Sequence, residues 1–166
     1  MGMPQEDLIN EAQGYLSRLQ HYVDSQVSLK HQNPLTAMED FYRELLNKVF
    51  GWNLRDDNLV GGKQQDSFDL SDRDKRVAVQ VTHTTNAKKI EKTLQMFVGK
   101  HDADFNRLVF AYSKMKVGKL RKPLAEIHKG FDFQVGRDRL SFLDVLEEIK
   151  RLNLEQKVEV VRFIRD

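Results

Sequence analysis

The chain has 166 residues, a length that suits one domain with a substantial core. Hydrophobic residues make up 40% and charged residues 31% of the chain, which describes a globular protein and excludes a disordered one. No apolar run is long enough to cross a bilayer, and the start MGMPQEDL lacks signal-peptide features, so we expect a cytoplasmic protein without a membrane partner. The absence of cysteine excludes disulfides and thiolate zinc sites, whereas a net charge of +2 permits a nucleic-acid partner without requiring one.

Two amphipathic helices are predicted at the N-terminus. The first runs from Glu6 to about Lys30, because its apolar residues recur at helical spacing. The pair Asn33-Pro34 breaks the chain, and Thr36 is then expected to cap a second helix, with Glu39 completing a capping box. Gly51 closes this helix. The doubled start Met1-Gly2-Met3 is consistent with a segment cut from a longer protein.

The stretch Ser67–Thr82 predicts two short strands joined by a charged turn over residues 71–75, after a loop over 52–65 that contains a short strand at Leu59-Val60. Phe68 and Leu70 are expected to face one side and Asp69 the other. In the second strand Gln80 and Thr82 share a face, and the obvious hairpin register adds Asp69 to it. The result is a polar row of an acid, an amide and a hydroxyl.

The remainder of the chain predicts a crossover and a helical tail. A helix from Ala87 to about Gly99 and a strand over 107–113 follow the hairpin, which favours parallel pairing of the two flanking strands. A basic loop over 114–122, a short helix over 124–129 and an edge strand over 131–134 come next. Ser141 and Asn153 are expected to cap the last two helices, whose inward residues are Phe142, Val145, Leu146, Ile149, Leu152, Leu154, Val158, Val161 and Ile164.

The polar row has a structural and a functional interpretation. Half of the side chains on an antiparallel strand face water, and this alone accounts for the three polar residues. Alternatively, Asp69 and the amide oxygen of Gln80 coordinate a divalent cation, since Mg²⁺ prefers oxygen ligands and takes few of them from the protein. Such an ion can activate water for phosphodiester hydrolysis.

The pattern of an FDL strand, a charged turn, VAVQVT and a helix resembles the PD-(D/E)XK (restriction-endonuclease-like) superfamily, in particular its Mrr-like branch. More narrowly, the segments KHQNPLTAMEDFYRELLNKVF, DSFDLSD, VAVQVTHTT and KKIEKTLQMF resemble the SMEK domain, which is found in larger bacterial proteins. The resemblance implies an α/β fold with a restriction-endonuclease-like core: a central mixed β-sheet with a β-hairpin, a crossover helix and flanking helices. It implies one domain over residues 1–166, with a helical pair at 5–50, a nuclease-like core at 54–135 and a second helical pair at 141–165.

The resemblance also implies a catalytic set. Asp69 matches the motif aspartate and Gln80 the position held by Glu or Gln, whereas Thr82 replaces the superfamily lysine. In related folds this lysine can come from the following helix, where Lys89, or its neighbour Lys88, is available. Further metal ligands would be Asp66 and Glu39, although a solvated lysine and a capping glutamate explain Lys89 and Glu39 equally simply.

Two functions follow from this resemblance. The first is Mg²⁺- or Mn²⁺-dependent cleavage of DNA in bacterial antiphage defence. The second is a catalytically inactive module for nucleic-acid binding or for pairing with another copy, which the missing strand lysine and the long first helix favour. Nucleic-acid binding is expected at a basic segment whose loop can neutralise phosphates, formed by Lys114, Lys116, Lys119, Arg121 and Lys122.

Overall fold

The structure, a computed structural model, describes residues 4–28, 33–56, 68–83, 87–118 and 131–166. These residues form five helices and a mixed five-stranded sheet. The helices are α1 (Pro4–Ser28), α2 (Asn33–Phe50), α4 (Ala87–Phe97), α5 (Phe142–Lys150) and α6 (Leu154–Arg165). The strands are β1 (Arg55–Asp56), β2 (Leu70–Asp72), β3 (Val77–Thr82), β4 (Arg107–Tyr112) and β5 (Arg139–Leu140).

The sheet has its strands in chain order, β1-β2-β3-β4-β5. β1, β2 and β3 form an antiparallel meander, in which Leu70 pairs with Val79. β4 then pairs in parallel with β3, and β5 in parallel with β4. The predicted parallel pairing across the helical crossover α4 is therefore confirmed.

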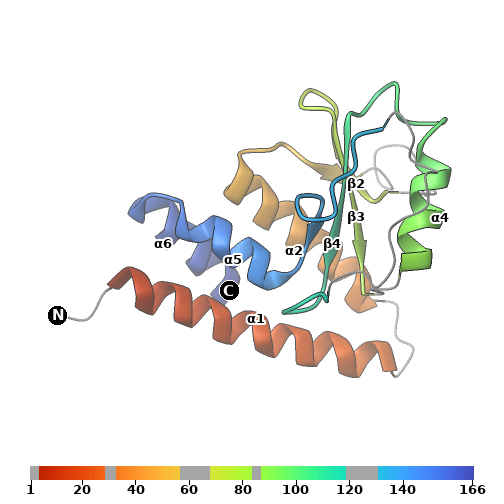
Figure 1. Ribbon diagram of the computed structural model, residues 1–166. Coiled ribbons are helices and arrows are strands. Elements are labelled where there is room, and N and C mark those ends of the chain that lie inside the picture. Colours follow the sequence, from red (N-terminus) through yellow and green to blue (C-terminus); the bar gives the residue numbers. More distant parts are fainter. Residues whose placement is uncertain (1–3, 29–32, 57–67, 84–86, 119–130) are drawn as a thin grey trace.

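Helices cover both faces of the sheet (Figure 1). α4 lies on one side, and α1, α2, α5 and α6 lie on the other, with α1 running along the lower edge of the view. None of the described helices is long and apolar enough to span a membrane.

Two hydrophobic clusters, one on each side of the sheet, form the core. The larger one joins the buried faces of α1, α2, α5 and α6 to Leu70, Val79 and Val109 of the strands. The smaller one joins α4 to Phe68, Ala78 and the alternate residues of β4. Both faces of β4 are thus buried, as expected for a central strand of an α/β sheet.

The bounds of the helices agree closely with the sequence predictions, apart from the start of α2. α1 buries Ile9, Ala12, Leu16 and Val23 within the chain. α2, however, begins at Asn33, three residues before Thr36. Thr36 lies inside the helix, so the predicted capping box with Glu39 is wrong.

The predicted strands differ from the observed ones in more places. Residues 55 and 56, predicted as loop, form β1, and β2 extends through Asp72, so the turn lies at 73–76 instead of 71–75. Phe68 packs beneath α4, whereas Leu70 packs on the opposite side, so the prediction that they share a face is wrong. The short strand predicted at 59–60 and the short helix predicted at 124–129 lie outside the described residues.

The predicted edge strand at 131–134 is not formed. Phe131 and Phe133 are buried because their rings pack edge-on against Phe97 and Phe110. Their alternation therefore reflects burial in an irregular segment, and the edge of the sheet is formed by β5.

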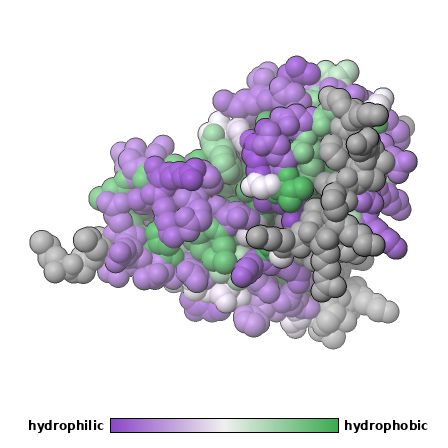
Figure 2. Space-filling model, viewed as in Figure 1, coloured by the Kyte–Doolittle hydropathy of each residue, from purple (hydrophilic) through white to green (hydrophobic). Residues whose placement is uncertain are grey.

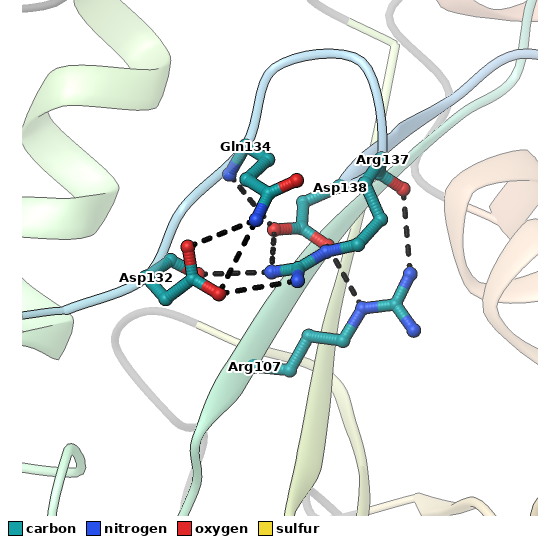
Figure 3. A network of polar contacts seen from close by, with 5 residues as sticks. All are labelled: Arg107, Asp132, Gln134, Arg137 and Asp138. Atoms are coloured by element: carbon teal, nitrogen blue, oxygen red, sulfur yellow. Dashed lines mark hydrogen bonds and ion pairs between the residues drawn. The ribbon is translucent and has the colours of Figure 1, made fainter.

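The irregular segment is fixed by a polar network around Asp138, a carboxylate with no exposed surface (Figure 3). The side chain of Asp138 accepts hydrogen bonds from Arg107 Nε at 2.8 Å, from Arg137 and from the backbone N–H of Gln134. The buried charge of Asp138 thus has two cationic partners, which is the condition under which burial of charge is tolerated.

Both predicted C-terminal caps are confirmed. Ser141 and Asn153 accept hydrogen bonds from the backbone of Asp144 and Gln156, which in turn complete capping boxes. Leu154, predicted to face inward, is 49% exposed, and Lys157 one turn later is buried instead.

Candidate functional site

Two carboxyl groups meet where helix α2 passes the start of β2. The side chains of Glu39, in α2, and Asp69, directly before β2, are hydrogen bonded to each other. Asp69 is only 7% exposed, and Glu39 is partly buried. Residues 30 positions apart in the chain thus share one proton-binding site.

The position of Asp69 follows from the end of the β2–β3 ladder. Its backbone N–H donates to the carbonyl of Val79 at 2.9 Å. Its Oδ2 accepts a hydrogen bond from the backbone N–H of Val81, also at 2.9 Å. The carboxylate thereby satisfies a strand N–H beyond the paired part of β2, which gives Asp69 a structural role and a fixed orientation.

Burial and mutual repulsion make the pair hard to ionise. Removal from water is the largest effect and, together with the charges of Asp69 and Asp56, raises the pKa of Glu39 to about 8. The pKa of Asp69 is also raised by burial, although the hydrogen bonds from Val81 and Glu39 oppose this. The two carboxyls therefore hold a proton between them at neutral pH.

A third acid and a lysine act on the pair. Asp56 in β1 is 8% exposed, and its charge raises the pKa of both Glu39 and Asp69. Lys89, in the first turn of α4, lowers the pKa of Asp69 by charge attraction. The helix that follows β3 thus does bring its lysine within electrostatic reach of Asp69.

Other residues of the predicted set lie less centrally. Gln80 is partly buried on β3, and no hydrogen bond joins its side chain to Asp69 in the described part of the chain. Thr82 is buried, and its backbone carbonyl accepts a hydrogen bond from Ser113. Asp66 lies outside the described residues.

Within the described ranges, no three acidic or histidine side chains are grouped closely enough to hold a metal ion by themselves. Asp56 was not among the residues selected from the sequence. In the sequence, Asp56 is marked only by the pair of acids at 56–57, which is equally typical of a loop. The short strand that orients Asp56 was not predicted.

The basic segment is described only in part. Lys114 lies 3.7 Å from Asp24 of α1, and Lys116 is exposed. Lys119, Arg121 and Lys122 lie outside the described residues.

A second polar cluster lies beyond the ends of β3 and β4. The ring of His83 contacts Ser113 Oγ through Nδ1 at 2.8 Å and Asp24 through Nε2 at 2.9 Å. Burial and the nearby Lys114 lower the pKa of His83, while Asp24 opposes the shift. Ser113 has no exposed surface, so this cluster fastens α1 to the sheet and does not present a nucleophile to solvent.

The SMEK domain family model matches residues 11–150, which include every element that positions the carboxyl pair. The chain belongs to the SMEK domain family. Comparisons with curated proteins and with solved structures give no match. The SMEK match covers most of α1 and all of α2, α4 and α5, so it includes helices on both sides of the sheet, whereas α6 lies beyond it.

Proposed function

We propose that this SMEK domain cleaves DNA phosphodiester bonds with the help of Mg²⁺ or Mn²⁺. The observation that carries the proposal is the hydrogen-bonded pair of Glu39 and Asp69 with the charge of Lys89 acting on it. The succession of a helix, a three-stranded meander, a crossover helix and a parallel strand supports a restriction-endonuclease-like core.

The donor set fits a hard divalent cation. Mg²⁺ is commonly held by one or two carboxylates while water and substrate oxygens complete its shell. Glu39 and Asp69 offer two such groups, and their raised pKa values indicate a site where added positive charge is favourable. A cation bound there would polarise the phosphate and lower the pKa of a bound water.

Each side chain of the site would have a separate role in metal binding or in catalysis. Asp69, fixed by the Val81 N–H, would orient the ion, and Glu39 would complete the pair after losing its proton. Lys89 would stabilise charge on the phosphate or hold the attacking water, in place of the cation that Thr82 cannot supply. Gln80 and Asp66 would serve as additional oxygen ligands.

DNA would be held by the basic segment that begins at Lys114. Neutralising phosphates with lysines and arginines makes binding sequence-independent and sensitive to salt. A role in antiphage defence, as part of a larger protein, is proposed on the family resemblance described above.

The test is cleavage of plasmid and linear DNA by the purified chain with Mg²⁺, Mn²⁺ or EDTA. We expect metal-dependent cutting that Asp69→Asn and Lys89→Met abolish while the circular dichroism spectrum is retained, since Asn keeps an oxygen to accept from Val81. Lys92→Met, at an exposed position on the same helix, is the matched control and should retain activity. Cutting by Asp69→Asn at the wild-type rate would contradict the proposal.

The alternative is an inactive module that binds nucleic acid or another copy. The hydrogen bond from Val81 to Asp69 favours it, because it explains a buried acid without catalysis. The long α1 favours it less than the sequence suggested, since the apolar stripe of this helix packs inside the chain. DNA retardation without cutting, together with no heat of Mg²⁺ binding in calorimetry, would select this alternative.

A further inference from the structure

Far from the carboxyl pair, a pocket of about 460 Å³ lies between the N-terminal half of α1 and helices α5 and α6. This volume falls in the range of small-molecule sites. Apart from Ile9 its lining is polar and consists of Gln5, Glu6, Asn10, Gln13, Lys150 and Lys157.

Lys157 in this lining is a buried cation with no anionic partner among the described residues. Only 7% of it is exposed, and its Nζ donates to the side-chain oxygen of Gln5 at 2.5 Å. No ion pair joins it to a carboxylate in the described part of the chain. Burying a charge is costly unless it is paired, and an ammonium has three hydrogens to donate.

Other buried charges in the same molecule are better compensated. Asp138 has two guanidinium partners (Figure 3). Arg139, the other buried cation among the described residues, stacks on the ring of Tyr112 and donates to the Tyr112 hydroxyl and the Gly118 carbonyl. In the part of the chain that the structure describes, Lys157 has one neutral hydrogen-bond partner and a pocket beside it, so we expect its counter-charge to bind in the pocket.

The rest of the lining indicates which anion fits. Asn10 and Gln13 carry amide N–H donors, and Lys150, half exposed and paired with Glu147 at 2.7 Å, adds positive charge. Glu6 is the single carboxylate among the described lining residues, and it can accept a hydrogen bond from an anion that keeps a proton. Hydrogen phosphate, or a terminal phosphate monoester, has both the oxygens and the hydroxyl that this arrangement needs.

We propose that this pocket binds a phosphate group, with Lys157 as its principal charge partner. The site is independent of the carboxyl pair, and its ligand is either free phosphate or the terminal phosphate of a larger molecule. Nothing in this proposal requires the domain to cleave DNA.

The experiment follows the side-chain amide resonances of Gln5, Asn10 and Gln13 by NMR during titration of the full chain, with chloride at matched ionic strength as reference. Three probes distinguish the sources: inorganic phosphate, a 5′-phosphorylated oligonucleotide and the same oligonucleotide without its terminal phosphate. We expect saturable shifts with a probe that carries free or terminal phosphate. If only inorganic phosphate shifts the resonances, the ligand is free phosphate. If the 5′-phosphorylated oligonucleotide shifts them as well, and the unphosphorylated oligonucleotide does not, the site also binds terminal phosphate monoesters.

Lys157→Met keeps the apolar stem and removes the charge, so phosphate affinity should fall at least tenfold. Gln13→Glu, at an exposed position, places a negative charge on the rim and should weaken binding similarly without disturbing the buried stem. Lys92→Met, on the exposed side of α4, is the control and should bind as the wild type does. No saturable shift with any phosphate, or equal affinity in the wild type and Gln13→Glu, would overturn the proposal.

Discussion

The Glu39–Asp69 pair places two acids where water is largely excluded, and this arrangement opposes folding at high pH. The pKa of Glu39 is about 8 in the folded chain, against about 4.5 for an ordinary glutamate. Between these values the folded state holds a proton that the unfolded state releases. The free energy of unfolding should therefore decrease as pH rises from about 5 to about 8.

Glu39→Gln should flatten this pH dependence, because the amide keeps the hydrogen bond and cannot ionise. In the absence of divalent cations the variant should be more stable than the wild type at pH 8 and close to it at pH 5. Urea unfolding at a series of pH values measures this. Glu44→Gln, an exposed acid on the same helix, should leave the wild-type slope in place.

The same proton connects pH to metal binding. If both carboxylates hold Mg²⁺, the shared proton must leave, so affinity should rise with pH up to about 8 and binding should release protons. Calorimetry in buffers of different ionisation enthalpy measures the number released. Binding with no proton release and no pH dependence would place the ion elsewhere.

Asp138 is the residue on which the irregular segment before β5 depends. Asp138→Ala would leave Arg107 and Arg137 without their buried partner, and breaking a buried pair costs about 3 kcal/mol or more. Asp132, 66% exposed and also paired with Arg137, is the control. Asp132→Ala should destabilise the domain far less than Asp138→Ala does, because exposed ion pairs contribute little. Urea denaturation of both variants distinguishes the two costs.

At the scale of elements, each of the two C-terminal helices begins with a capping box formed by residues close together in the chain. Ser141 receives the backbone N–H of Asp144, and Asp144 reaches back to the backbone N–H of Ser141. Ser141→Ala should destabilise the domain by about 1 kcal/mol, the usual effect of losing an N-cap, and Ser141→Thr should restore most of it. Thermal or urea unfolding measures both. An unchanged stability in Ser141→Ala would mean that tertiary packing alone sets the start of α5.

At the scale of the whole molecule, the C-terminal half of α1 is tied to the segments that directly follow β3 and β4. Gln20 accepts a hydrogen bond from the backbone of Met115, and Asp24 contacts His83 and Lys114. Figure 2 shows a largely hydrophilic surface, with apolar atoms visible among the helices that include α1, α5 and α6. The helix is thus an integral part of the domain, in agreement with the family match from residue 11.

His83→Ala should loosen the C-terminal half of α1 without unfolding the domain. Loss of a hydrogen-bonded partner worth about 1 kcal/mol corresponds to about fivefold faster amide exchange where local opening dominates. Hydrogen exchange read by mass spectrometry over residues 16–28 measures it. Tyr22→Ala, at a position 56% exposed on the same helix, should leave exchange unchanged.

Sequence alone determined those features that depend on neighbours along the chain. Helical spacing predicted all five described helices, because one buried face imposes a period of 3.6 residues. Ser141 and Asn153 were found because a cap is a contact over three residues. The strand–helix–strand order predicted the parallel pairing of β3 and β4.

Tertiary structure decided what depends on contacts between distant segments. A two-residue strand such as β1 has no period to detect, and Phe131 and Phe133 alternate because they pack on α4 and β4. Glu39 showed a capping pattern in sequence, but its hydrogen bond is to Asp69, 30 residues away. The raised pKa of that pair and the burial of Lys157 arise from water excluded by several elements at once, and no local pattern carries that information.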